Sequence, residues 1–292
     1  MQWISDSNIL IVGLGLMGGS YARALKRLGF TVTAVSRSQS TIDYALAEGI
    51  IDAGSAEADP ELLGSADAVI LALYPGAMLD WLREHQRYLK PGALLTDVTG
   101  VKSAVVYDAQ ELLRPDLEFI ASHPMAGREV YGVRNSRAEL FQGANFLITP
   151  TERNSDAAID WCAGLGRLVG CRRVSILSPE EHDEMIGFVS QLTHCIAVAL
   201  MTSNSDPHLA DYTGDSFRDL TRIARINDEM WSELFLKNRP ALLRQMDAFA
   251  EEFQTLRDLI SAEDREGLRD KLRLSTRRRA QFDNVEREER AL

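Results

Sequence analysis

Two histidines and an arginine, in three separate parts of the chain, have the side chains best suited to moving a proton and binding an anion. His123 lies in the stretch FIASHPMAG, His194 in SQLTH, and Arg222 in FRDLTRIA. An imidazole accepts a proton near neutral pH. A guanidinium binds carboxylates through paired hydrogen bonds, so Arg222 and Arg218, one helical turn apart, indicate an anionic substrate. Each residue alone also has a structural explanation, as a turn histidine, a core histidine or a surface arginine paired with an acid.

A glycine-rich stretch near the start, NILIVGLGLMGGS over residues 8–20, predicts a dinucleotide site. Its apolar residues suit a buried strand, and an amphipathic segment then runs to Leu28 and ends at Gly29. In the spacing G-x-G-x-x-G, the first glycine turns the chain, the second approaches a pyrophosphate, and the third packs helix against strand. A strand–helix turn without a ligand is the alternative. We assign the dinucleotide contacts to the glycines and the residues between them: Gly13, Gly15, Leu16, Met17 and Gly18.

The residues after the second expected strand, Phe30–Val35, bear on the choice of coenzyme. NAD-binding units usually place an acid there to hold the ribose 2′-hydroxyl. This chain has Ser36, Arg37 and Ser38 instead. A cation between two hydroxyl groups suits a 2′-phosphate, so we expect NADP rather than NAD. An arginine that stacks on adenine would leave NAD acceptable.

Expected strands and helices alternate over the first 177 residues, which contain the glycine-rich stretch and His123. This alternation predicts a doubly wound, mainly parallel sheet, whose ligand crevice lies outside the carboxyl ends of the strands. His123, Thr99 and Lys102 follow expected strands at that edge, and we add Tyr74, Pro75 and Asp97 to the cofactor contacts. The further expected strands are Ala68–Leu73, Leu94–Val98, Phe119–Ser122, Asn145–Thr149 and Arg173–Leu177, with a helix at Met78–Tyr88.

Strand signals cease near residue 178, which divides the chain into a dinucleotide-binding domain, residues 1–177, and a helical domain, residues 178–292. The first helical segment has a serine cap and early acids, and then becomes apolar on nearly all sides. We expect a buried helix here, because its most apolar part, Ile186–Met201, is shorter than a usual membrane span. Helical spacing puts its polar residues on one face: Gly187, Ser190, Gln191 and His194.

The C-terminal tail carries an apolar stripe with helical spacing, from Leu242 to Ile260. Little sheet remains to cover this stripe, so it is most easily buried against other helices. We therefore expect a homodimer that forms through the helical domain.

Composition excludes several classes of partner. The chain of 292 residues has 43 acidic and 32 basic residues and a net charge of −11, which argues against binding to nucleic acid or an anionic membrane. Three cysteines without a CxxC pair fit reduced thiols in the cytoplasm and no thiolate metal site. Met1 leads almost directly into the first expected strand, so we expect no signal peptide.

Three motifs together resemble the prephenate/arogenate dehydrogenases of tyrosine biosynthesis: GLGLMGGS, SHPMAG, and the pair SQLTH and FRDLTRIA. The resemblance runs from Asn8 into the C-terminal helices and includes Trp231 in NDEMW. It implies an N-terminal Rossmann domain, a helical domain that pairs into a dimer, and an active site between these two domains. The implied reaction is an oxidative decarboxylation: hydride leaves C4 of the cyclohexadienol for NAD(P)+, and the ring carboxylate departs as CO2. No metal is implied.

The resemblance also implies roles for individual residues. His123 is the histidine that accepts the C4 hydroxyl proton, His194 is the second active-site histidine, and Arg222 binds a substrate carboxylate. Many relatives have a serine where this chain has Gly100, which leaves Thr99 as a substitute. The remaining expected substrate contacts are Gln191, Arg128 and Ser190, of which Gln191 and Arg128 depart from the usual pattern. These departures leave prephenate and arogenate open as substrates. The chain ends without an added regulatory or mutase domain, so we expect no tyrosine feedback through such a domain.

Two other functions fit parts of the sequence. A β-hydroxyacid dehydrogenase or imine reductase also joins a Rossmann domain to a helical one. The hydroxyacid enzymes depend on a lysine in the helical domain, where this chain offers Gln191 and His194. A dinucleotide sensor without catalysis would leave His123, His194 and Arg222 unexplained as a set. Coenzyme reduction on adding prephenate, arogenate or a β-hydroxyacid separates the three functions.

Overall fold

The N-terminal part of the chain forms a six-stranded parallel sheet with the strand order of a Rossmann fold. The computed structural model describes residues 7–290, so the expectation that no signal peptide precedes the first strand concerns residues outside this range. The order β3-β2-β1-β4-β5-β6 is that of two dinucleotide-binding halves, which confirms the predicted doubly wound sheet. The strands are β1 (Asn8–Val12), β2 (Thr31–Val35), β3 (Ala53–Ser55), β4 (Ala68–Leu71), β5 (Leu94–Asp97) and β6 (Glu118–Phe119).

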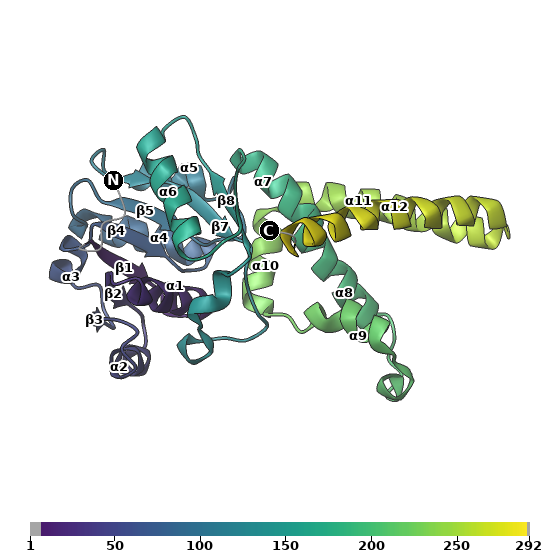
Figure 1. Ribbon diagram of the computed structural model, residues 1–292, viewed down its shortest axis with the longest axis horizontal. Helices are drawn as coiled ribbons and strands as arrows, with labels where there is room; N and C mark the ends of the chain where they lie inside the picture. Colours follow the sequence, from purple (N-terminus) through teal and green to yellow (C-terminus); the bar gives the residue numbers. More distant parts are fainter. Residues whose placement is uncertain (1–6, 291–292) are drawn as a thin grey trace. The chain divides into compact units, whose positions relative to one another are not determined.

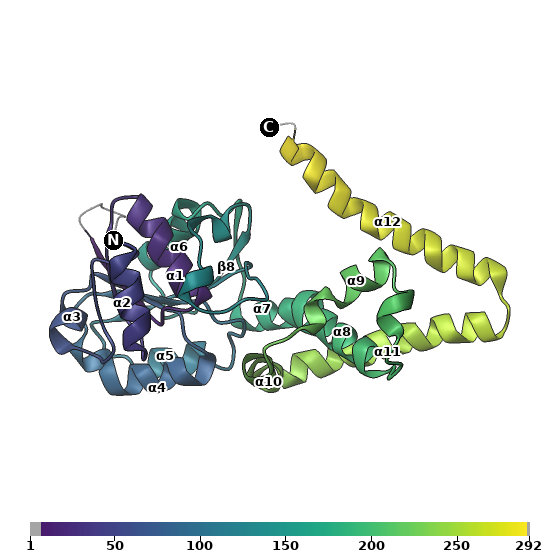
Figure 2. The same ribbon diagram turned by 90° about the horizontal axis from the view of Figure 1, so that it is seen from below.

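Helices cover both faces of this sheet because its strands are apolar on both sides. In β1, Ile9 and Ile11 belong to one hydrophobic core, and Leu10 and Val12 belong to another. Figure 2 shows the two helical layers on opposite sides of the strands. The first core includes α1 (Leu16–Arg27), α2 (Gln39–Ala47) and α6 (Asp156–Leu168); the second includes α3 (Pro60–Gly64), α4 (Pro75–His85) and α5 (Val106–Leu112).

Three of the expected strands form a second sheet rather than extending the first. β7 (Ala121–Pro124) pairs antiparallel with β8 (Asn145–Thr149), which pairs parallel with β9 (Arg173–Ile176). The expected strand Phe119–Ser122 is split, since β6 ends at Phe119 and β7 starts at Ala121. The prediction of a single sheet for all these strands was therefore wrong. Apolar composition marks a strand but does not select its pairing partner.

The chain continues from residue 178 as helices (Figure 1). Ser178 begins α7 with a reciprocal capping box, in which its hydroxyl accepts from the backbone N–H of Glu181. The helices are α7 (Pro179–Ile186), a π-helical turn (Gly187–Leu192), α8 (Thr193–Thr202), α9 (Asp215–Thr221), α10 (Asp228–Lys237), α11 (Arg239–Ser261) and α12 (Arg265–Arg290). Short 3₁₀ turns lie at Gln86–Tyr88, Val133–Asn135, Ala138–Phe141, Leu209–Tyr212 and Arg222–Ala224.

The apolar helix over Pro179–Thr202 is more exposed than its sequence predicts. Phe188 is 56% exposed and Met185 52%, and only 28% of its most apolar window is buried. The prediction of a buried helix is therefore wrong for the single chain. Among the described residues this is the one helix long and apolar enough to cross a membrane, by length and composition alone. Acidic residues in its first turn, Glu180 and Glu181, are typical of a helix that begins in water.

The chain divides into two compact units, one up to Leu242 and one from Leu243, with the division falling within α11. In the second unit, α11 and α12 are joined by an ion pair of 2.5 Å between Lys271 and Glu252. The predicted apolar stripe is uncovered there, with Phe253 and Ile260 each 63% exposed.

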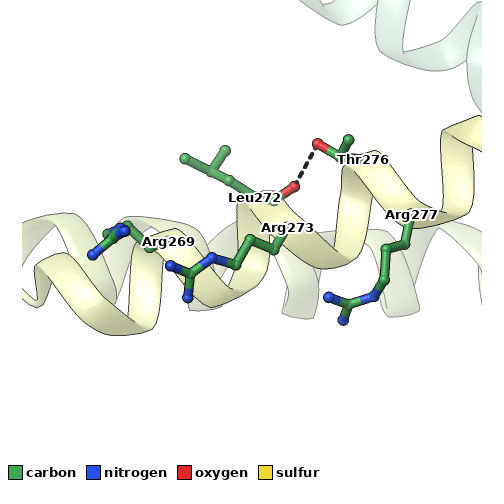
Figure 3. Close-up of a pocket in the computed structure, with 5 residues that line it drawn as sticks. All are labelled: Arg269, Leu272, Arg273, Thr276 and Arg277. Atoms are coloured by element: carbon green, nitrogen blue, oxygen red, sulfur yellow. Dashed lines mark hydrogen bonds between the residues drawn. The ribbon is translucent and has the colours of Figure 1, made fainter.

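A shallow depression of about 460 Å³ lies along α12, and all its lining residues come from that one helix (Figure 3). Arg269 pairs with Glu266, and Arg273 pairs with Asp270, so acids on the same helix neutralise two of the three arginines at the depression. None of the residues assigned to chemistry lies in it. The lining residues are Arg269, Leu272, Arg273, Thr276 and Arg277.

Candidate active site

The three glycines of the first loop have different surroundings, and only one faces open space. Gly13 has φ of +96°, and a Cβ there would lie 2.5 Å from the carbonyl oxygen of Ala72. A Cβ at Gly18 would overlap the carbonyl oxygen of Gly13. Gly15 has no atom within 4 Å of its Cβ direction. Two glycines therefore permit packing, whereas Gly15 leaves space for another molecule to approach the backbone.

The start of α1 is suited to an anion. Gly15 is its N-cap and supplies no side chain, and the first turn contains no acid. Leu16 and Met17 are the first helical residues, so their backbone N–H groups have no partner within the helix. The glycine loop, through its motif and the open space at Gly15, fits the pyrophosphate of a dinucleotide.

The end of β2 lies beside this loop, because the backbone N–H of Gly13 donates to the carbonyl of Val35 over 2.8 Å. Ser36 is half-buried, and Arg37 and Ser38 are exposed. The Ser38 hydroxyl contacts that of Ser40 at 2.9 Å. Within the described part of the chain, Arg37 has no ion pair, so its guanidinium is available to a ligand.

The residues after β4 connect the sheet to α10. Tyr74 is exposed, and its hydroxyl accepts a hydrogen bond from Asn227 at 3.1 Å. Pro75 is buried as the first residue of α4. The backbone N–H of Gly76 donates to the Glu233 carboxylate at 2.7 Å. The N-terminus of α4 is therefore capped from α10.

The polar residues after β5 form a buried network rather than an open site. Asp97 and Lys102 have no exposed side-chain surface, and Lys102 Nζ lies 2.6 Å from Asp97 Oδ2. The Lys102 ammonium also donates to the carbonyl of Ser122 at 2.6 Å, and the Ser122 N–H donates to Asp97 Oδ1 at 3.0 Å. The expectation that Asp97 contacts the cofactor is therefore corrected, since protein donors occupy both carboxylate oxygens.

Thr99 belongs to the same network. It is 4% exposed, and its hydroxyl group contacts the Asp97 carboxylate and the carbonyl of Val101. Its backbone N–H also donates to Asp97 at 2.9 Å. The expected catalytic role of Thr99 is corrected on this geometry, because the hydroxyl is directed into the protein.

His123 projects from β7 and contacts a histidine that the sequence analysis did not single out. Its Nδ1 lies 2.9 Å from Nε2 of His182, and Nδ1 of His182 lies 2.8 Å from Oδ1 of Asp183. His182 is fully buried, and Asp183 is 5% exposed. Both stand in the stretch PEEHDEM, where the sequence suggested only acids at the start of a helix. The adjacent His–Asp pair was the signal available.

His194, Trp231 and Arg222, which come from the helical part of the chain, form a second group of candidate site residues. The rings of His194 and Trp231 stack with centroids 3.7 Å apart, and His194 Nδ1 donates to the carbonyl of Ser190 at 2.8 Å. Arg222 pairs with Glu129, which follows SHPMAG. Burial lowers the pKa of His194; Glu129 opposes this shift, and Arg222 adds to it. These three residues therefore lie close enough to act on one another.

Gln191 does not belong to this group of candidate site residues. It is 1% exposed; its amide donates to the carbonyl of Leu234 at 3.2 Å and accepts from Asn238 at 2.7 Å. The expected substrate contact of Gln191 is thus corrected, since its amide joins two helices. The π-helical turn changes the helical register between Gln191 and His194. Ser190 is half-buried, and Arg128 is exposed with no ion pair among the described residues.

Gly100, which follows β5, lies between Leu234 of α10 and His123 of β7. A Cβ there would be 3.6 Å from the Leu234 side chain and 3.8 Å from Cε1 of His123. Leu234 belongs to the same core as Leu95 of β5 and Met78 of α4. The α10 helix therefore packs beside His123 at the carboxyl edge of the sheet, where dinucleotide-binding folds hold their ligands.

Comparison with known proteins agrees with this arrangement. The family model "Prephenate dehydrogenase, nucleotide-binding domain" matches residues 21–182, and "Prephenate dehydrogenase, dimerization domain" matches residues 178–274. A prephenate dehydrogenase of Bacillus subtilis is 32% identical over 92% of this chain and 74% of its own length. The chain belongs to the prephenate dehydrogenase family.

Two solved structures extend the family match to three dimensions. The prephenate dehydrogenase of A. aeolicus, in complex with hydroxyphenyl propionate and NAD+, has a TM-score of 0.89 at 31% identity, over 96% of this chain and all of that one. Synechocystis arogenate dehydrogenase has a TM-score of 0.81 at 28% identity, over 94% and 99% of the two chains. The fold predicted from the family resemblance, a Rossmann domain followed by helices, is therefore confirmed.

The surroundings of His123 predict the pH dependence of this family member. Burial, the neighbouring His182 and the Lys102 ammonium hold the pKa of His123 well below its usual value of 6.5. A base with a lowered pKa stays unprotonated to lower pH. We therefore expect kcat/KM to be level from neutrality through pH 6.5 and to fall only below it, rather than between 6 and 7 as an ordinary histidine would predict. An acid limb centred above pH 6.5 in steady-state rates would contradict this expectation.

Proposed function

We propose that this protein is an NAD(P)-dependent dehydrogenase that oxidatively decarboxylates prephenate to 4-hydroxyphenylpyruvate in tyrosine biosynthesis. The observation that carries the proposal is the meeting of His123 with the α10 helix at the carboxyl edge of a Rossmann sheet. The A. aeolicus relative, which holds NAD+ and hydroxyphenyl propionate, supports it over nearly the whole chain.

The proposed roles follow from the position of each side chain. His123 takes the proton of the C4 hydroxyl, because its imidazole is held unprotonated near neutral pH. Arg222 binds a substrate carboxylate in place of its partner Glu129. His194, stacked on Trp231 and bonded through Nδ1, presents Nε2 as the second histidine. The nicotinamide, when bound, supplies the hydride acceptor. The open backbone at Gly15 and the first N–H groups of α1, at Leu16 and Met17, would hold its pyrophosphate, and Gly13 and Gly18 give the loop its turn and its close packing.

Arogenate is the second candidate substrate, and the similarity to the Synechocystis arogenate dehydrogenase favours keeping it. The two substrates differ in the side chain that carries the second carboxylate, a keto acid in prephenate and an amino acid in arogenate, so the polar residues that contact this side chain bear on the choice. Arg128 and Ser190 stay proposed substrate contacts on this ground.

The assay is coenzyme reduction by the purified full chain with prephenate, arogenate or a β-hydroxyacid as the only substrate. We expect NAD(P)H to form with prephenate, and with arogenate if the site accepts an amine in place of the keto group. Turnover of the β-hydroxyacid alone would replace the proposal with a hydroxyacid dehydrogenase. Coenzyme binding without turnover of any substrate would indicate a sensor.

We propose NADP as the preferred coenzyme, on the exposed guanidinium of Arg37 between Ser36 and Ser38 beside the glycine loop. The replacement Arg37→Ala removes a charged partner of the 2′-phosphate, so kcat/KM for NADP should fall by about 10- to 150-fold. The value for NAD should change little. Equal losses for the two coenzymes, or a wild-type enzyme that prefers NAD, would show that Arg37 does not contact the phosphate.

We propose that the enzyme is a homodimer formed through its helical part, residues 178–292, with the dinucleotide-binding domain over residues 1–177. The family model for the dimerization domain supports this division. The uncovered side chains of Phe188 and Phe253 supply apolar surface for the contact. Sedimentation at micromolar concentration should give twice the chain mass. A species near 32.5 kDa would contradict the dimer.

We also propose that the protein acts in the cytoplasm. The cysteines are free thiols, and burial raises the pKa of Cys162 to about 12 and that of Cys171 to about 11. Thiols with such pKa values stay protonated and weakly nucleophilic at neutral pH, which fits buried cysteines in a reducing compartment.

A further inference from the structure

Three side chains behind the proposed base form a continuous hydrogen-bonded chain into the protein. Asp183 Oδ1 lies 2.8 Å from His182 Nδ1, and His182 Nε2 lies 2.9 Å from His123 Nδ1. His182 and Asp183 come from α7, whereas His123 comes from β7. The first two are buried, so neither meets the substrate. They can act on the reaction only through His123.

The Asp183 carboxylate, at the far end of this hydrogen-bonded series from His123, is held in place by backbone donors. The Asp183 carboxylate receives the backbone N–H of Lys102 at 2.8 Å on Oδ1 and that of Ser103 at 2.9 Å on Oδ2. Burial alone would raise the pKa of Asp183, but these bonds and the one from His182 hold it below its ordinary value. Asp183 is therefore ionised at neutral pH, and an ionised carboxylate accepts hydrogen bonds without donating any.

Because the Asp183 carboxylate can only accept, it fixes the donor and the acceptor in both hydrogen bonds that link it to His182 and His182 to His123. His182 must carry its proton on Nδ1 to donate to Asp183. Burial and Lys102 lower the pKa of His182 despite Asp183, so its ring is neutral and Nε2 has a free lone pair. His123 must then donate from Nδ1 to that lone pair. The neutral His123 ring is left with its own lone pair on Nε2.

The charged groups around the two rings oppose a second proton. Lys102 is fully buried, and its ammonium is balanced by Asp97 at 2.6 Å. The Asp183 carboxylate is the negative charge that lies against the His182 ring. A proton added to His123 would face His182 and the Lys102 ammonium. The neutral pair of rings is therefore the stable state between substrate turnovers.

We propose that His182 and Asp183 are positioning residues that hold His123 in the tautomer with its proton on Nδ1, which makes Nε2 the proton acceptor of the reaction. This inference rests on the proposed function of His123 and adds the atom that accepts the proton. Without the pair, the ring is free to carry its proton on Nε2, where it donates rather than accepts.

The direct test is the ¹⁵N spectrum of the histidine rings in the substrate-free enzyme at neutral pH, with each of the five histidines assigned by substitution. We expect a protonated Nδ1 and an unprotonated Nε2 for both His123 and His182. A wild-type His123 that carries its proton on Nε2 would overturn the proposal. This readout needs no substrate, so it is independent of whether prephenate is turned over.

The kinetic test compares two replacements of His182. His182→Phe keeps a ring but removes the acceptor, and we expect kcat to fall by about 10- to 100-fold, the range typical of groups that orient a histidine ligand at metal sites. Substrate and coenzyme KM should change less than about 3-fold, because neither ligand contacts His182. His182→Gln can offer an amide oxygen to Nδ1 of His123 and should recover most of the lost kcat. Wild-type kcat in His182→Phe would overturn the proposal.

The matched control is Glu181→Gln on the same helix. Glu181 is exposed, and within the described part of the chain its carboxylate bonds to Ser178 at the start of α7. This variant should therefore lose some stability while keeping kcat and the His123 tautomer. If His182→Phe does not fold, the wild-type spectrum and His182→Gln decide the question. A wild-type enzyme that is inactive with prephenate would refute the proposed function, and the spectrum would still decide the tautomer.

Discussion

Replacement of His123 by asparagine is expected to lower kcat by about 10²–10⁴-fold, the usual contribution of a general base. Asparagine keeps a hydrogen-bonding group of similar reach, so it preserves the local packing at β7 while removing the proton acceptor. The coenzyme KM should be unchanged, because the glycine loop lies between β1 and α1, and His123 is not among the atoms nearest to its glycines. Steady-state rates with prephenate, and coenzyme binding measured by fluorescence, check the two expectations.

The matched control for this variant is His208→Asn. His208 is exposed, in a turn before α9, and its ring pairs with Asp211 at 3.5 Å. Its replacement should leave kcat unchanged. Turnover of His123→Asn at the level of this control would remove His123 from the mechanism, whatever the wild-type pH profile shows.

Replacement of Arg222 by alanine is the second large effect, and it should appear in substrate affinity. Loss of one charged hydrogen-bonding partner of a carboxylate is worth about 1.5–3 kcal/mol, or about 10- to 150-fold in KM. The variant also leaves the Glu129 carboxylate without its partner, which adds repulsion toward an anionic substrate. The coenzyme KM should stay the same. Initial rates over a range of prephenate concentrations separate the two constants.

Arg218→Ala is the matched control, one helical turn earlier. Arg218 pairs with Asp215 on its own helix at 2.8 Å and is exposed. Its replacement should leave the KM for prephenate unchanged. Equal KM values in the two variants would return Arg222 to a surface role, and an Arg222→Ala protein with a much lower melting temperature would assign it to stability.

The parts of the fold that could be predicted from sequence are those with local causes. The strand Asn8–Val12, the glycine loop and α1 were predicted together, because a left-handed turn at Gly13 and the close packing of Gly18 leave a recognisable spacing. The cap at Ser178 was readable for the same reason. The strand pairing could not be predicted, since β8 carries an apolar run like those of the first sheet, while its partner β7 is short and contains Ser122 and His123.

The candidate site was predictable in its reactive groups and not in their partners. His123, His194 and Arg222 stand in recognisable motifs. Whether a polar side chain faces a ligand or the protein depends on neighbours distant in sequence. Asp97 accepts from the N–H of Ser122, 25 residues away, and Gln191 accepts from Asn238, 47 residues away. The role of His182 is likewise set by β7, 59 residues away. No local pattern contains these contacts.

The fate of the C4 hydrogen of prephenate reports directly on hydride transfer from the substrate to the coenzyme. Prephenate labelled with deuterium at C4 is incubated with the enzyme and NADP or NAD, and the products are analysed by mass spectrometry. We predict that deuterium appears in the reduced coenzyme, with one equivalent of CO2 and of 4-hydroxyphenylpyruvate for each coenzyme reduced. Release of CO2 without coenzyme reduction, or reduced coenzyme without deuterium, would contradict an oxidative decarboxylation by hydride transfer from C4.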